Sequence, residues 1–124
     1  MSLSDSSVGP LEPFEHRYLD ALSEEGVDLP IFLDGWRRAM DDDLARLSVL
    51  RHRQSDPDHL HGVLHRLSGA AGLVGALSLM EALRRASAAP LEQSCSSIDA
   101  LIDRSKNLVR QIEAPPFAYR NTQP

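Results

Sequence analysis

The chain has a single cysteine, Cys95, among its 124 residues. An internal disulfide is therefore impossible, and we expect Cys95 to be a small, unreactive side chain. No apolar run approaches the roughly 18 residues that a membrane-spanning helix needs. The opening stretch MSLSDSSVGPLEP has neither the basic start nor the apolar middle of a signal peptide. These absences predict a cytoplasmic protein that has no membrane segment.

Basic residues are also few, because 13 Lys and Arg stand against 18 Asp and Glu and give a net charge of −5. A nucleic-acid partner is not expected, since no dense stripe of Lys and Arg is present to neutralise phosphates. The sequence contains neither a Walker loop nor a protein-kinase nucleotide motif. We therefore expect a protein that is not an enzyme in its own right and does not hydrolyse ATP.

The composition fits one compact domain, since 42% of 124 residues are hydrophobic and only one is Trp. Residues 1–12 are rich in Ser and predict a flexible N-terminal tail. Residues 114–124, APPFAYRNTQP, predict a Pro-containing C-terminal tail, because they have three prolines and no hydrophobic period. The domain is expected to cover residues 13–113. Its apolar residues recur at spacings of three and four, which indicates an all-α fold.

Turn and cap residues divide this domain into five expected helices. The first is a short helix over about 13–25 that stops at Gly26, and the second is a long helix that is capped by Asp28 and ends near Arg53. The third helix starts at Asp56 and Pro57. The fourth lies between Gly75 and Pro90, and the fifth covers about 92–113. Short connections between long helices favour antiparallel neighbours. The predicted architecture is an antiparallel four-helix bundle with a short extra N-terminal helix.

The third helix carries an unusual stretch, HLHGVLHRLSGAAGLVGA, over residues 59–76. At about 100° per residue, Leu60, Leu64, Leu67 and Ala71 share the core face, whereas His65 projects roughly 140° away. The neighbours expected on the outward face are His61, Gly62, Ser68, Gly69 and Gly72. Each helical Gly costs about 0.5–1 kcal/mol relative to Ala. Small residues around His65 therefore predict a reactive group presented to a large partner.

The same residues have other interpretations. His61 and His65 have the i, i+4 spacing of two metal ligands, with His59 nearby, but no carboxylate or Cys ligand accompanies them and no HExxH motif is present, so no metal is expected. Gly69 and Gly72 would also permit close helix packing, and this alternative stays open. The acidic residues 41–43 are expected to be solvated surface, because consecutive side chains diverge around a helix.

The stretch HRLSGAAGLVGA resembles the signature of histidine phosphotransfer (HPt) domains. That signature has a phosphorylatable His, an apolar residue at +2, Lys at +3, Gly at +4 and a Gly-Ala-like turn about ten residues on. The matching positions are His65, Leu67, Ser68, Gly69 and Gly75-Ala76. LPIFLDGWRRAMDDDLARL and SDPDHLHGVLHRL are also similar to the family, and the resemblance covers residues from about 14 to 112. Ser68 departs from the pattern, since it replaces the usual Lys.

The resemblance implies a phosphorelay signalling protein of a two-component system. His65 would exchange a phosphoryl group with the aspartate of a response-regulator receiver domain, in a pathway that starts at a sensor or hybrid histidine kinase. The receiver would supply Mg²⁺, so the chain needs no cofactor of its own. Arg66 or Ser68 is expected to help neutralise the phosphoryl group, with His61, Gly62, Gly69 and Gly72 supporting or docking the partner. A helical adaptor that docks on a receiver or another partner without being phosphorylated is the alternative, and Ser68 keeps it open.

Overall fold

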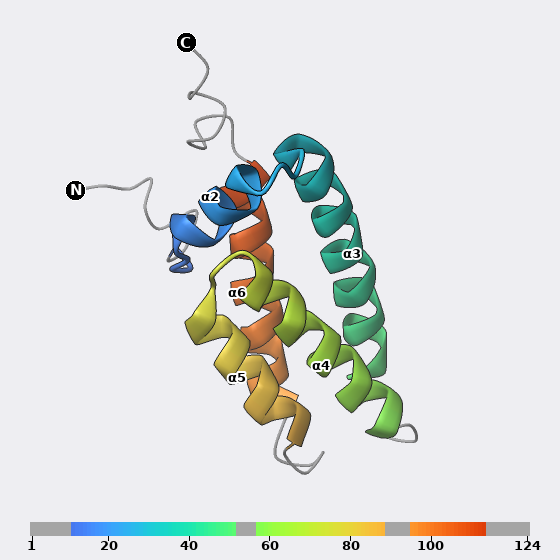
Figure 1. Cartoon of the computed structure of the whole chain (residues 1–124). Coiled ribbons are helices and arrows are strands. Elements are labelled where there is room, and N and C mark those ends of the chain that lie inside the picture. The colour runs from blue at the N-terminus through green and yellow to red at the C-terminus, as the bar shows by residue number, and fades with distance from the viewer. Residues whose placement is uncertain (1–10, 52–56, 89–94, 114–124) are drawn as a thin grey trace, which may run out of the picture.

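The computed structural model of the chain describes residues 11–51, 57–88 and 95–113. Within these ranges every regular element is a helix and there is no strand, so the all-α prediction is confirmed (Figure 1). The elements are α2 (His16–Glu24), α3 (Leu29–Leu50), α4 (Pro57–Leu73), α5 (Leu77–Ala88) and α6 (Cys95–Glu113). None of these helices combines the length and the apolar character that crossing a membrane requires.

The helix ends follow the local signals of the sequence. Asp28 caps α3 as predicted, because its Oδ1 accepts a hydrogen bond of 3.3 Å from the backbone N–H of Ile31. Pro30 lies in the first turn of the same helix. Gly26 and Gly75 adopt φ of +96° and +84°, a left-handed conformation that only Gly enters readily. The predicted turns at Gly26 and Gly75 are therefore confirmed.

Some predicted boundaries differ from the structure or fall outside it. α2 begins at His16 and not near residue 13, and residues 11–15 before it have no regular secondary structure. Pro57 does open α4, but the predicted cap Asp56 lies outside the described residues. The start of the last helix at 92 and the proline stop at 90 also lie outside them, as do both predicted tails except for Leu11 and Glu12.

The four longer helices pack in a ring. α4 contacts both α3 and α5, and α6 contacts the same two helices, so each has two neighbours (Figure 1). α5 runs back alongside α4 after the tight turn at residues 74–76. The short α2 lies across one end of this bundle-like assembly and contacts α3. The ring leaves the outer face of α4 uncovered, and His65, Gly69 and Leu73 are exposed along it.

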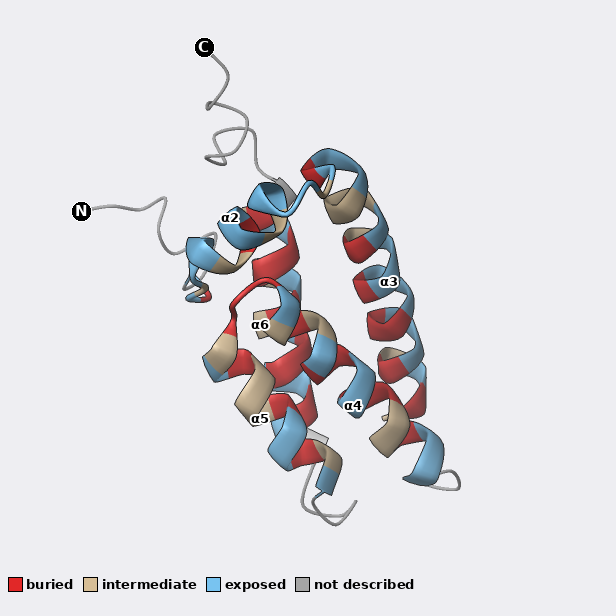
Figure 2. Cartoon of the chain, viewed as in Figure 1, coloured by how far each residue is buried: buried red, intermediate tan, exposed pale blue. Residues whose placement is uncertain are grey.

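The core fills the space between the four longer helices, and their buried faces point toward one another (Figure 2). The core residues predicted for the third and fifth helices and the turn after the third are all buried: Leu60, Val63, Leu64, Leu67, Ala71, Val74, Ile98, Leu101, Ile102, Leu108, Val109 and Ile112. Trp36 of α3 donates its indole N–H to the backbone oxygen of Ala70 at 2.9 Å. This bond fixes α3 against the second half of α4, the helix that carries His65.

Candidate functional site

His65 lies on the uncovered face of α4. Its side chain is exposed, while Leu64 and Leu67 on the core face of the same helix are fully buried. Its imidazole has no hydrogen bond or ion pair with the rest of the described residues. The predicted outward direction of His65 is confirmed. The ring is therefore accessible to a molecule that approaches α4 from solvent.

Two glycines leave open space beside this histidine. Gly62 precedes His65 by three residues and Gly69 follows it by four, so both flank it on the same helix face. A Cβ atom at either glycine would meet no heavy atom within 4 Å. Neither glycine is therefore required by the packing of the domain itself.

Gly72 has a different role from Gly62 and Gly69. A Cβ atom at Gly72 would lie 2.9 Å from the sulfur of Met80 on α5. The close-packing alternative is therefore correct for Gly72, where α4 and α5 approach each other. It is not correct for Gly69, which is exposed.

Ser68 is buried, with 4% of its surface exposed, so its predicted position on the outward face is wrong. By helical geometry it lies about 80° from Leu60 and about 40° from Gly72, on the side that α5 covers. Its hydroxyl donates a hydrogen bond of 2.8 Å to the backbone oxygen of His65. That bond satisfies the buried hydroxyl within α4 and turns its hydrogen away from the imidazole.

Arg66 is tied to α3 by an ion pair with Asp43. Its Nε and Nη2 lie 3.3 and 3.1 Å from the two Asp43 oxygens, and Arg46 lies 3.0 Å from the same carboxylate. The Asp43 side chain is only 12% exposed, so the prediction of a solvated acidic run is wrong at this position, although Asp41 and Asp42 are exposed. The hydrogen bond to Asp43 and then its charge raise the pKa of Arg66. Arg66 therefore stays a cation held toward α3.

An apolar groove of about 790 Å³ opens one helical turn beyond His65, where α2, α4 and α5 meet. Its lining comes from three helices and one cap residue: Arg17, Tyr18, Ala21 and Leu22 of α2, Glu25 directly after α2, Gly69, Gly72 and Leu73 of α4, and Leu77 and Met80 of α5. Leu73 leaves 52% of its surface exposed there. No pattern in the sequence indicates this groove directly, because its walls depend on where α2 lies.

The other histidines of α4 do not complete a metal site in the described part of the chain. No group of three His, Cys, Asp or Glu residues there is arranged to hold a metal ion. His61 is half-buried one turn before His65, and His59 is exposed in the first turn of α4. The site that the structure does bring together consists of His65, the two open glycines and the groove beyond Gly69.

Comparison of the chain with models of known families, with characterised proteins and with solved structures finds no match. The function is therefore inferred from the residues and the geometry described above.

Proposed function

We propose that the chain is a histidine phosphotransfer domain built as an antiparallel four-helix bundle, with α2 as the short additional helix. The ring of contacts among α3, α4, α5 and α6 supports this architecture. The HPt-like motif around His65 supports the function. The proposed protein works in the cytoplasm, between a sensor or hybrid histidine kinase and a response regulator.

The observation that carries the proposal is the free space around an exposed histidine on a rigid helix. Phosphoryl transfer between two proteins requires the acceptor nitrogen to come within about 3–3.5 Å of the phosphorus atom. A receiver domain is a bulky partner, so long side chains beside His65 would prevent this approach. Gly62 and Gly69 keep that space open. The groove beyond Gly69 offers the apolar surface on which a receiver would dock.

The proposed reaction needs little from the chain beyond His65. An imidazole nitrogen attacks the phosphorus atom of an aspartyl phosphate, the bond from phosphorus to the carboxylate oxygen breaks, and the carboxylate leaves. The phosphoryl group is then held on one ring nitrogen and a proton on the other. The reverse sequence returns the group to a receiver. In-line positioning and charge stabilisation dominate such transfers, and the receiver would supply Mg²⁺ for the latter.

The direct test is labelling with phosphorylated receiver domains from the same source and, separately, with phosphoramidate as a small donor. We expect wild-type protein to gain one acid-labile phosphoryl group, measured by intact mass before and after mild acid. His65→Gln should abolish the label. Helix content and the unfolding midpoint should stay nearly unchanged, because the imidazole of His65 forms no hydrogen bond or ion pair with the described residues. His61→Gln is the matched control and should keep most of the label. Labelling of the His65→Gln protein, or its loss in the His61→Gln protein, would show that the assignment is wrong.

A helical adaptor that is not phosphorylated is the second candidate. It is favoured by the arrangement of Ser68 and Arg66, since the first is buried and the second is paired with Asp43. Such an adaptor would bind a receiver in a pull-down or by calorimetry and would take no label from either donor. Binding without labelling therefore supports the adaptor and rejects the phosphotransfer domain.

A further inference from the structure

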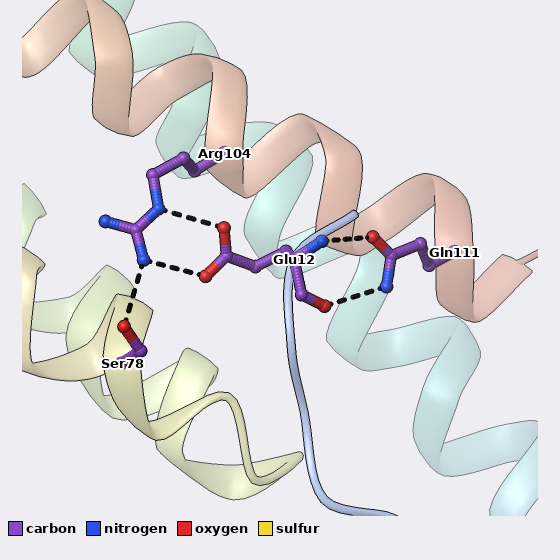
Figure 3. A network of polar contacts seen from close by, with 4 residues as sticks. All are labelled: Glu12, Ser78, Arg104 and Gln111. Atoms are coloured by element: carbon purple, nitrogen blue, oxygen red, sulfur yellow. Dashed lines mark hydrogen bonds and ion pairs between the residues drawn. The ribbon is translucent and has the colours of Figure 1, made fainter. Parts of the chain in front are cut away.

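The segment before α2 is fastened to α6 by a polar network (Figure 3). The Glu12 carboxylate is 5% exposed and accepts hydrogen bonds of 2.9 and 2.8 Å from the guanidinium of Arg104. Gln111 accepts from the backbone N–H of Glu12 at 2.5 Å and donates to its backbone oxygen at 2.9 Å. Arg104 also donates to the hydroxyl of Ser78 on α5 at 3.3 Å. We call Glu12, Arg104 and Gln111 the latch.

The latch was not predicted from the sequence, because Glu12 falls in the segment that was expected to be a flexible tail. Bidentate pairing of a nearly buried carboxylate with Arg is among the strongest and most directional of side-chain contacts. The hydrogen bonds to Glu12 raise the pKa of Arg104 against the opposing effect of its partial burial. Arg104 therefore remains charged.

A second tie fixes the same segment three residues later. The backbone N–H of Glu15 donates to the backbone oxygen of Gly75 at 3.1 Å, in the turn between α4 and α5. A Cβ atom at position 75 would lie 2.6 Å from the Glu15 oxygen, so the two backbones are in close contact. α2 starts at His16, directly after this tie. The start of α2 is thus held by α6 on one side and by the α4–α5 turn on the other.

α2 has little apolar packing of its own to hold it. Among its nine residues only Leu19 is buried, and Leu22 is partly buried against the core. Tyr18 and Leu22 of α2 line the apolar groove together with Leu73 and Met80, so α2 forms one wall of the groove. Apolar burial favours a helix position in proportion to the area removed from water, and this area is small for α2. The position of α2 therefore depends on the contacts at its start, and the latch supplies the side-chain contacts among them.

We propose that Glu12 and Arg104 are positioning residues that set the place of α2 and, through it, the shape of the groove on which a receiver domain docks. The inference rests on the proposed phosphotransfer function. Neither residue touches His65 or the phosphoryl group. Their effect is on the binding of the protein partner, while the reactivity of His65 toward a small donor is independent of them.

The test compares two donors and one local structural readout on the full chain. In Glu12→Gln, transfer from an acetyl-phosphate-charged receiver domain should fall on the order of tenfold at low receiver concentration. The loss should come mainly from a higher KM, because a displaced α2 makes the groove less complementary to the receiver and weakens docking. Labelling of His65 by phosphoramidate should be unchanged. Amide hydrogen exchange should accelerate in α2 but not in the core of α4. Arg104→Lys keeps the positive charge but cannot form the bidentate hydrogen bonds of a guanidinium, so it should show a smaller effect of the same kind.

Glu81→Gln is the matched control, since it removes a carboxylate that pairs with Arg84 on the exposed side of α5. It should change neither transfer nor exchange. Undiminished receiver transfer in both latch variants, or unchanged exchange in α2, would overturn the positioning role. If wild-type protein takes no label from either donor, the proposed function itself fails, and the exchange arm still decides whether the latch holds α2. If Glu12→Gln does not fold, Arg104→Lys gives the decisive comparison.

Discussion

A substitution at Gly69 should affect the stability of the domain and phosphotransfer from a partner in opposite directions. Gly69 lies inside α4 and is exposed, and a Cβ atom at this position would meet no heavy atom within 4 Å. Gly69→Gln should therefore stabilise the domain by about 0.5–1 kcal/mol, through better helix propensity and a less flexible unfolded chain. For a domain of this size, that free energy corresponds to a rise in Tm of roughly 2–4 °C.

The same substitution should impair transfer. The Gln side chain would stand one turn from His65 and at the edge of the groove, in the space that we assign to the receiver. A displacement of about 1 Å between the reacting groups can cost on the order of 10²-fold in rate. Tm and the rate of transfer from a phosphorylated receiver are measured on the same sample, so that stability and transfer are compared directly. Labelling by phosphoramidate should stay close to the wild-type level.

Gly35→Gln supplies the control for helix propensity. Gly35 is exposed in α3 and also has nothing within 4 Å of its Cβ position, but it does not line the groove. This variant should gain similar stability and transfer normally. If Gly69→Gln lowered Tm, the conclusion that the space beside Gly69 is open would be wrong. A stable Gly69→Gln protein with undiminished transfer would show that the receiver docks elsewhere and that our explanation of Gly69 is wrong.

Three further substitutions test the packing around the site by chemical unfolding. Gly75→Ala should lower the free energy of unfolding by at least about 1–2 kcal/mol, because of its positive φ, and an unchanged midpoint would contradict that conformation. Asp43→Asn should lower the free energy of unfolding by about 1–2 kcal/mol, which is less than the loss of a fully buried ion pair, because the Arg partners of Asp43 are half-exposed. Asp42→Asn, at an exposed position, should change it by no more than about 0.5 kcal/mol, and equal effects of the two variants would refute the burial of Asp43. Trp36→Phe removes the hydrogen bond to the backbone oxygen of Ala70 and should lower the free energy of unfolding by about 0.5–1.5 kcal/mol; an unchanged free energy of unfolding would argue against that bond.

The helices were predictable because their signals are local. The cap at Asp28, the left-handed turns at Gly26 and Gly75, and the apolar spacing of α4 and α6 each depend on a few neighbouring residues. Helical geometry alone also directed His65 about 140° away from Leu60 and the core face. Such features need no knowledge of how the helices pack, so one sequence suffices to predict them.

The errors concern residues whose environment is set by another helix. Ser68 is buried at an intermediate angle, about 80° from Leu60, so its burial depends on the neighbouring helix and not on the periodicity of α4. Asp43 belongs to an acidic run that is otherwise exposed, and its burial follows from the pairing with Arg66 across the contact between α3 and α4. Glu12 has its partner Arg104 far away in the sequence, at a distance that no periodicity reveals. Each of these contacts needs the tertiary arrangement.

The charges around His65 bear on how the proposed relay would behave. A phosphoryl group adds about two negative charges, and the chain already has a net charge of −5. The two neighbours expected to neutralise the group are engaged elsewhere, since Ser68 bonds within α4 and Arg66 pairs with Asp43. The phosphorylated state would therefore gain little stabilisation from these two side chains, and a partner that brings cations to the phosphoryl group would stabilise the transfer step. On this basis the proposed domain is a carrier that passes the group on and not a store that retains it.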